Sequence, residues 1–331
     1  MPSSPFPSTR TLTARLSQIL GIVGSTGGRV EVLDRSPEPN TSTFPVEVVT
    51  CRVGHSAPMT LLCKYSRPQR CQLPAWHRAH GHRHGVAYEA QVYRHVLEPL
   101  RMTTPRLCGA YEGPEGRSWL ALEYLDGCMP IKSVPEALES AAAWIGRFHA
   151  RNEPRVSEPA LQFVNIYTAD YYRGWARRTL AYARKHRRDC RTVEEVCEAF
   201  EQGIDALLAP PLTIIHGEFY PANVLLRSGD VHPVDWESAA VAGGEVDLAS
   251  LTEFWPPEAA DRCERAYVNA RWPGQRADSA FLRRLSVARS YMLLRWTGVS
   301  EAWRTQEDTS HYFGRLADEW TRLNDARPVV N

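Results

Sequence analysis

The chain has 331 residues, 39 basic and 38 acidic side chains, and a formal net charge of +1. This balance provides no whole-molecule attraction for nucleic acid or a membrane, and 43% hydrophobic residues exclude a wholly disordered or collagen-like chain. The apolar runs are shorter than the roughly 18 residues of a membrane-spanning helix, and the first residues lack a signal peptide's apolar core. We therefore expect a cytoplasmic protein with neither a membrane nor a nucleic acid as partner.

The first part of the chain is predicted to form a small antiparallel sheet with two helices. Apolar residues at helical spacing predict helices over residues 10–22 and 86–99. Alternating or β-branched runs separated by turn formers predict strands over residues 29–33, 46–53, 59–65, 105–111 and 118–124.

Beyond residue 128 the pattern becomes mainly helical. Helices are predicted over residues 134–150, 167–186, 192–208 and from 247 onward. Strand character returns before His216 and in a hairpin at residues 224–226 and 231–234. We therefore predict an α+β chain of two domains, a β-rich domain over residues 1–124 and a mainly helical domain over residues 125–331.

The segment TIIHGEFYPANVLLRSGDVHPVDWE, residues 213–237, places polar side chains at the ends of short strands. Its spacing is His216-x-Glu218-x-x-x-x-Asn223, followed by Asp235. Phosphoryl transfer needs an acid that receives the proton of the attacking hydroxyl, and an amide and a carboxylate that hold Mg²⁺ against the phosphates. The order and spacing are those of a kinase catalytic loop, although the acid is one methylene longer than the pattern.

A lysine in an apolar strand supports the same chemistry. Only three of the 39 basic residues are lysines, and Lys64 lies in the apolar run Leu61–Tyr65, where an unpaired charge is costly. Kinases place such a lysine on the third strand and pair it with a glutamate of the next helix. Glu89 lies on the predicted helix that follows, whereas the plain alternative is a surface lysine at a strand edge.

Over residues 29–300 the chain resembles the aminoglycoside phosphotransferase and choline kinase-like family. The motifs that carry the resemblance are HGEFYPANVLL and VDWESAAVAGGEVDLASL, with weaker matches at NTSTF, EYLDG and IGRFHA. The resemblance implies a bilobal protein-kinase-like fold with a nucleotide-covering first lobe. It also implies ATP and Mg²⁺ as cofactors, with ATP bound between the lobes, and transfer of the γ-phosphate to a hydroxyl.

The resemblance also implies roles for residues that match the motifs. Glu218 matches the catalytic acid, Asn223 and Asp235 match the metal ligands, and His216 and Asp247 match positions that brace the catalytic loop. The remaining matches concern the nucleotide. They are the phosphate-binding pair Lys64 and Glu89, the phosphate-covering loop Asn40, Thr41, Ser42 and Thr43, and the hinge positions Glu123 and Leu125, whose backbone groups meet adenine. Contacts to backbone groups are compatible with ATP and with GTP.

The glutamate at position 218 leaves two functions open. The expected function is ATP- and Mg²⁺-dependent phosphotransfer to a hydroxyl of a small molecule, an antibiotic or a metabolite, or of a peptide Ser or Thr. Because Glu218 replaces the usual Asp and shifts the reach of the acid by about 1.5 Å, the alternative is a pseudokinase. Such a module binds nucleotide or acts as a scaffold, with weak or lost transfer.

The charge pattern leaves the acceptor open. Residues 171–191 carry eight basic side chains and one acid, Asp189. This pattern suggests either a solvated helix face or a site that binds an acidic substrate or peptide. Residues 228–261 carry eight acids and no Lys or Arg, which could meet an amine. The loop HRAHGHRHG suggests zinc through His77, His80, His82 and His84, but its Arg and Gly content favours a mobile polar lid.

Overall fold

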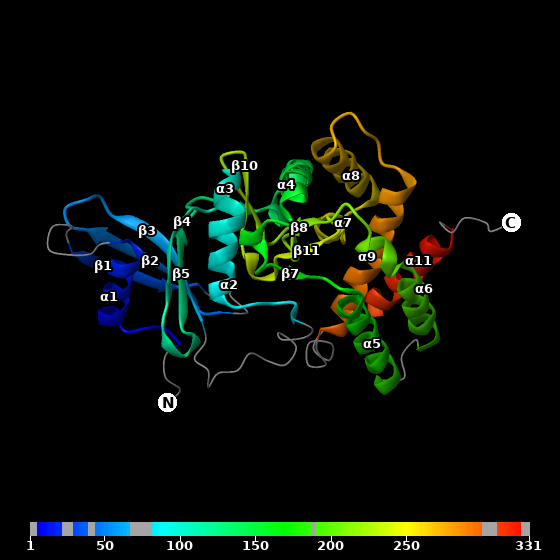
Figure 1. Ribbon diagram of the computed structural model, residues 1–331, viewed down its shortest axis with the longest axis horizontal. Helices are drawn as coiled ribbons and strands as arrows, with labels where there is room; N and C mark the ends of the chain where they lie inside the picture. The colour runs from blue at the N-terminus through cyan, green and yellow to red at the C-terminus, as the bar shows by residue number, and fades with distance from the viewer. Residues whose placement is uncertain are drawn as a thin grey trace. The chain divides into compact units, whose positions relative to one another are not determined.

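The computed structural model describes residues 5–21, 29–38, 44–66, 81–186, 190–299 and 310–325, in two compact units (Figure 1). The first unit comprises Met1–Cys128 and Arg227–Glu237, and the second comprises Met129–Leu226 and Ser238–Asn331. The chain therefore returns to the first unit for the eleven residues that end the predicted catalytic segment. The predicted phosphate loop, Asn40–Thr43, lies outside the described residues, as do His77 and His80.

Among the described residues of the first unit, five strands form one sheet in the order β1-β2-β3-β5-β4. All neighbouring strands are antiparallel, as predicted. The strands are β1 (Val30–Pro37), β2 (Val46–Val53), β3 (Met59–Tyr65), β4 (Leu107–Glu112) and β5 (Ser118–Glu123).

Strand β1 is longer than predicted, because it continues through residues that are typical of turns. After a register shift between Val32 and Asp34, the strand continues to Pro37, paired with β2. The Arg35 guanidinium binds both oxygens of the buried Glu47 carboxylate, at 2.9 and 2.7 Å. Pro37 is tolerated because β1 is an edge strand of the sheet.

Helix α1 (Thr9–Ile19) packs on one face of this sheet (Figure 1). The Ser8 hydroxyl caps the helix by accepting the Thr11 amide at 3.2 Å. Leu12 and Leu16, four residues apart, are buried in one cluster with Val49 and other sheet residues.

The predicted helix over residues 86–99 is present but not uniform. It consists of α2 (Val86–Gln91), the π-helical turn η2 (Val92–Leu97) and α3 (Glu98–Leu100). Helix α2 contacts β4 and β5. It therefore delivers Glu89 to the sheet.

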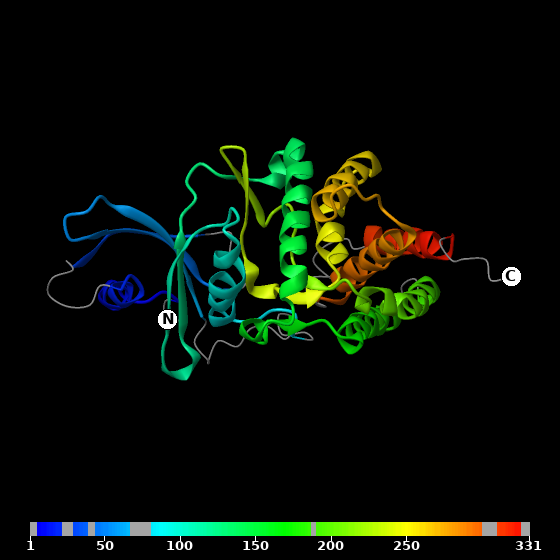
Figure 2. The ribbon, with the colours of Figure 1, turned by 45° about the horizontal axis from the view of Figure 1, so that its top comes forward.

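The second unit is mainly helical in its described part, as predicted. The helices are α4 (Leu138–Asn152), α5 (Ala169–His186), α6 (Cys190–Leu208), α7 (Glu245–Thr252), α8 (Pro257–Arg271), α9 (Ser279–Gly298) and α11 (Ser310–Asp325). Helices α4 and α8 lie side by side (Figure 2). At Gly146 they approach so closely that a Cβ would lie 2.7 Å from the Tyr267 carbonyl oxygen.

Short strands in this region position the loop that carries His216 and Glu218. Three of them, at residues 129–130, 165–166 and 240–242, were not predicted from the sequence. β7 (Asn165–Ile166), β11 (Ala240–Ala242) and β8 (Thr213–Ile215) form a small sheet in the order β7-β11-β8, and β8 leads directly into His216. The third missed strand, β6 (Met129–Pro130), pairs with β9 (Val224–Arg227) at Leu225 and Leu226. β9 and β10 (Asp230–Pro233) flank a tight turn in which Ser228 and Gly229 both have positive φ.

The seven cysteines among the described residues are all free thiols. No helix of the described chain combines the length and apolar character needed to cross a membrane.

The buried side of α1 makes a testable contribution to stability. We expect Leu16→Ala to lower the free energy of unfolding by about 2–5 kcal/mol, because it leaves a cavity under the sheet. Leu33→Ala is the matched control: Leu33 on β1 is 40% exposed, so its loss should cost less than about 1 kcal/mol. Urea unfolding of both variants measures the difference, and equal losses would contradict the packing described for α1.

Candidate active site

The alternation of β3 decides where Lys64 points. Successive side chains of a strand face opposite sides of the sheet. Cys63 and Tyr65 face the cluster under α1. Lys64 therefore faces the other side, where Glu89 of α2 is found.

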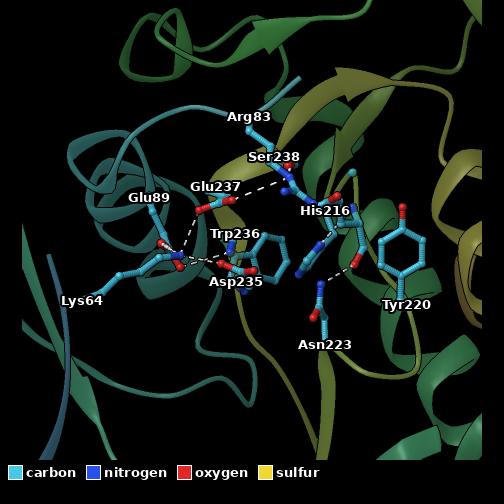
Figure 3. A network of polar contacts seen from close by, with 12 residues as sticks. Lys64, Arg83, Glu89, His216, Tyr220, Asn223, Asp235, Trp236, Glu237 and Ser238 are labelled. Carbon is cyan, nitrogen blue, oxygen red and sulfur yellow. Dashed lines mark hydrogen bonds and ion pairs between the residues drawn. The ribbon is translucent and has the colours of Figure 1, made fainter. Parts of the chain in front are cut away.

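The Lys64 ammonium group lies among three carboxylates of the described residues (Figure 3). Its Nζ atom is 2.7 Å from Glu89 Oε2, 2.5 Å from Asp235 Oδ1 and 3.1 Å from Glu237 Oε2. The Lys64, Glu89 and Glu237 side chains are buried, whereas the Asp235 side chain is 36% exposed. Asp235 is therefore the carboxylate of this cluster that solvent reaches most readily.

Backbone contacts fix the segment that carries two of these carboxylates. The Trp236 amide donates to Glu89 Oε1 at 3.2 Å, and the His84 amide donates to the Glu237 carbonyl at 3.0 Å. Asp235 has a φ of +68°, a left-handed conformation that a non-glycine residue adopts rarely. These contacts hold the Asp235 carboxylate against Lys64.

Burial and mutual charge shift the pKa values of this cluster. Burial alone lowers the pKa of the Lys64 ammonium group, but Asp235, Glu237 and Glu89 raise it well above its usual value. Burial raises the pKa of Glu89, against the opposing effect of Lys64. Burial raises the pKa of Glu237 to about 8, again opposed by Lys64. Burial therefore opposes ionisation of Glu89 and Glu237, and the Lys64 ammonium group favours it.

The cluster contains oxygen ligands of the type that Mg²⁺ prefers. Oxygen atoms of Glu89, Asp235 and Glu237 all lie within 4.8 Å of one another. The cluster offers three carboxylates against one ammonium group, so its residue types fit an additional divalent cation. Of the two predicted metal ligands, Asp235 belongs to this first unit and Asn223 to the second.

In the second unit, the loop after β8 is held by one buried carboxylate. Asp247 accepts the His216 amide at 2.7 Å and the Gly217 amide at 2.9 Å. The His216 ring Nδ1 in turn accepts the Glu218 amide at 3.3 Å. At Gly217, φ is +82° and a Cβ would lie 2.2 Å from the Ser238 carbonyl oxygen, so the glycine is required. His216 and Asp247 therefore make the contacts of a brace.

The brace continues into a buried polar chain. Asp247 Oδ2 lies 3.1 Å from His149 Nε2, and His149 Nδ1 lies 2.9 Å from the Tyr267 hydroxyl. The Tyr267 hydroxyl also accepts from Arg271 at 2.6 Å. Burial lowers the pKa of His149, although Asp247 opposes the shift. A neutral imidazole bridges the carboxylate and the hydroxyl without adding a buried charge.

The predicted catalytic acid, Glu218, is buried and has partners on both carboxylate oxygens. The Arg295 guanidinium of α9 donates to Oε1, and the Ser238 hydroxyl donates to Oε2 at 3.3 Å. The Asn223 side-chain nitrogen donates to the Glu218 carbonyl at 3.1 Å, which brings two predicted site residues together. With its nitrogen occupied, the Asn223 amide has its oxygen as the atom suited to a metal.

Sequence reasoning missed Arg295, Ser238 and the contact of Glu237 with Lys64. Glu237 and Ser238 lie in the motif VDWES, so they could have been considered by their proximity to Asp235. Arg295 carries no such signal, because it lies 77 residues after Glu218 in a chain that contains many arginines.

The predicted hinge residues lie at and after the end of β5. The Glu123 amide donates to the Arg106 carbonyl at 2.9 Å, and the Glu123 carboxylate meets Arg227 at 3.3 Å. Leu125 is buried. These contacts show two ordered positions and leave their role toward adenine as a prediction.

Two arginines of the basic segment before residue 191 pair with the acidic helix that follows it. Arg173 binds Glu201, and Arg184 binds Glu194 at 2.8 Å. Arg178 donates to the carbonyls of Gly298 and Val299. Arg187 and Arg188 lie outside the described residues. The contacts of Arg173, Arg178 and Arg184 reduce the availability of these arginines for an acidic substrate.

An acid-rich cavity of about 340 Å³ lies among α7, α8, α9 and α11. Its charged lining consists of Glu253, Asp261, Glu264, Glu319, Arg289 and Arg315. Arg289 is paired with Glu264 at 2.5 Å. Glu253 accepts the Trp296 indole N–H at 2.6 Å. Burial raises the pKa of Glu253 to about 7.

Comparison with known proteins shows the family of the chain. A model of the phosphotransferase enzyme family matches residues 67–282, well over half of the chain. The match begins just after Lys64, so the first three strands lie outside it. No curated protein matches the chain.

Solved structures with the same fold include kinases and phosphotransferases. A choline/ethanolamine kinase family protein from Mesorhizobium loti is 17% identical, with a TM-score of 0.53 over 96% of this chain and 94% of that chain. Spectinomycin phosphotransferase with ADP and spectinomycin is 11% identical, with a TM-score of 0.58 over 97% and 99%. A mutant aminoglycoside 2′-phosphotransferase with GDP is 10% identical, with a TM-score of 0.62 over 96% and 98%. These neighbours confirm the predicted α+β fold class of kinase-like enzymes.

The brace under the catalytic loop predicts a loss of stability in Asp247→Asn. The His216 and Gly217 amides donate to different oxygens of Asp247, and an asparagine keeps only one of these positions as an acceptor. We expect a loss of about 1–3 kcal/mol in the free energy of unfolding, measured by urea unfolding. Asp205→Asn, at an exposed position of α6, is the matched control and should change stability by less than about 0.5 kcal/mol. Equal effects would contradict the brace.

The raised pKa of Glu253 predicts a pH dependence of stability. The folded chain retains this proton up to about pH 7, whereas the usual value is 4.5, so stability falls as pH rises between the two. The loss attributable to Glu253 is on the order of 3 kcal/mol, and it should be absent in Glu253→Gln. Unfolding at pH 4.5 and pH 7.5 measures it, with the exposed Glu258→Gln as control. A wild-type loss that persists unchanged in Glu253→Gln would be inconsistent with this pKa.

Proposed function

The chain belongs to the phosphotransferase enzyme family, and we propose that it moves the γ-phosphate of ATP to a hydroxyl with the help of Mg²⁺. Family membership confirms the predicted enzyme class, a phosphotransferase of the kinase type. The observation that supports the finer proposal is the contact of Lys64 with both Glu89 and Asp235. A buried lysine on the third strand, paired with a glutamate of the next helix, is the arrangement that holds nucleotide phosphates.

The residues of the first unit bind and orient the nucleotide in this proposal. Lys64 donates to phosphate oxygens, and Glu89 keeps the ammonium group in place from the side of α2. Backbone groups at Glu123 and Leu125 meet the base. Asp235 would be a ligand of Mg²⁺ on this unit, and the ion neutralises charge on the phosphates when bound.

Glu218 acts on the acceptor in this proposal. An ionised carboxylate orients the attacking hydroxyl and receives its proton. Asn223 binds the backbone of the same residue, so one short loop supplies both the acid and a metal ligand. The bracing of this loop by Asp247 keeps the two in register.

A small molecule that carries an amine is the acceptor class that the charges favour. The cavity of the second unit is lined by four acids and two arginines, and one of these arginines is already paired. Arg173 and Arg184 of α5 are engaged by α6 and Arg178 by carbonyls of the chain, which argues against an acidic peptide. The structural neighbours include a spectinomycin phosphotransferase bound to spectinomycin and a choline/ethanolamine kinase family protein. We therefore place an amino alcohol or antibiotic before a peptide Ser or Thr.

A pseudokinase remains the second candidate, and one specific observation favours it. Both oxygens of Glu218 have protein partners, and the side chain is buried. A carboxylate held in this way is less available to a substrate hydroxyl. The assembled Lys64 cluster favours catalysis instead, because a scaffold has no chemical need for it.

The function is tested by mass spectrometry for phosphate transfer. The protein would be incubated with Mg²⁺ and ATP, or GTP, and a panel of aminoglycosides, amino alcohols, nucleosides and Ser/Thr peptides. We expect a phosphorylated amine-bearing product with wild type. Glu218→Gln should lower the rate by about 10²–10⁴-fold with ATP binding intact, and Asp235→Ala should weaken binding of Mg·ATP.

The control for Asp235→Ala is Asp230→Ala, at an exposed position of β10, which should behave as wild type. Full activity of Glu218→Gln would show that the acid is assigned wrongly, and unchanged Mg·ATP affinity in Asp235→Ala would remove the metal assignment. Bound ATP without transfer to any acceptor would favour the pseudokinase.

A further inference from the structure

The buried ion pair between Arg295 and Glu218 has no part in the function as described so far. Arg295 lies near the end of α9, and its side chain is 4% exposed. Its guanidinium donates to Glu218 Oε1. The pair joins the last turns of a long helix to the loop that follows β8.

Arg295 is held in place by more than this ion pair. One guanidinium nitrogen donates to the Tyr220 hydroxyl and, at 3.4 Å, to the Gly217 carbonyl. The guanidinium carbon lies 5.6 Å from the centre of the Tyr220 ring and 5.9 Å from that of Trp296. Cations near aromatic faces are attracted to them. Arg295 therefore presents a fixed donor to Glu218 rather than a mobile one.

Burial makes the two charges depend on each other. A charge removed from water is costly unless it is paired and hydrogen-bonded. Breaking a buried pair by removing one partner leaves the other charge uncompensated. The Arg295 side chain is 4% exposed and the Glu218 side chain is 2% exposed. Each charge is therefore buried, and each is paired with the other.

The pair also explains how the longer acid can be positioned. Glutamate has one more rotatable bond than aspartate and places its carboxylate about 1.5 Å further from the backbone. Arg295 holds one oxygen and Ser238 holds the other, so rotation of the carboxylate is restricted. A carboxylate has about four lone-pair sites, so two hydrogen bonds leave capacity for a substrate hydroxyl.

We propose that Arg295 is a positioning residue that fixes the Glu218 carboxylate for phosphoryl transfer. The inference rests on the proposed function, in which Glu218 receives the proton of the acceptor hydroxyl. Glu218 and Arg295 then act together, because the arginine holds the carboxylate at the longer distance from the backbone that the extra methylene group gives it. An aspartate at position 218 would fall short of this partner.

The test is a set of variants assayed for transfer to the best acceptor of the panel and for ATP hydrolysis. Arg295→Met should lower kcat by about 10²-fold, the loss that a displacement near 1 Å can cause, with KM for ATP within about twofold. Arg295→Lys keeps the charge and should retain more activity. Glu218→Asp should lower kcat in the wild-type background and cause little further loss when combined with Arg295→Met.

A double-mutant cycle of Glu218→Gln and Arg295→Met separates positioning from stability. If Arg295 acts through Glu218, the double variant should be no slower than Glu218→Gln alone. Arg284→Met is the matched control, since Arg284 is a buried arginine of the same helix whose ion pair, at 3.2 Å, is with Glu245. It should lose stability and keep its kcat within about twofold.

Two results would overturn the proposal: a kcat of Arg295→Met within twofold of wild type, or rate losses that multiply in the double variant. Urea unfolding of the same four proteins tests the pair without any activity, because coupled losses show that it exists in solution. A wild type that transfers no phosphate, even to water, would overturn the proposed function and the catalytic purpose of the pair, while the unfolding cycle still reports on the pair itself.

Discussion

A buried ammonium group needs carboxylates at contact distance, because an unpaired charge in the interior costs several kcal/mol. Lys64 meets this need with Glu89, Asp235 and Glu237. These contacts join β3, α2 and a segment more than 170 residues away in the chain. The return of Arg227–Glu237 to the first unit follows from this requirement, since the segment brings two of the carboxylates. The same contacts leave Asp235 partly exposed, where a divalent cation can reach it.

The second unit applies the same constraint to buried carboxylates. Asp247 is satisfied by two backbone amides and a histidine, so it orders the loop that carries Glu218. Glu218 is satisfied by Arg295 and Ser238, so its direction is fixed by α9 and by the residue that follows Glu237. The contacts of Asp247 thus fix the backbone of the loop, and the contacts of Glu218 fix the direction of its reactive side chain. Both units are organised by charges that burial forces into specific pairs.

Much of the fold was predictable, because it depends on local periodicity. The sheet strands alternate in burial, and the helices carry apolar residues at helical spacing, so most elements were found near their observed bounds. β1 was predicted too short, because its second half gains strand structure from pairing with β2 rather than from its own residues. The two-residue strands β6 and β7 lack enough residues for any periodic signal.

By itself, the sequence determined which residues carry the candidate chemistry. The spacing of His216, Glu218, Asn223 and Asp235 is local, and Lys64 is conspicuous in a chain with three lysines. The tertiary structure alone decided what these groups contact. It paired Glu218 with Arg295, added Glu237 to the Lys64 cluster and bound arginines of α5 to glutamates of α6. The physical reason is that arginines are abundant in this chain, and the local sequence does not show which of them contacts a carboxylate. Burial in one place, opposite one carboxylate, is what distinguishes Arg295 from the others.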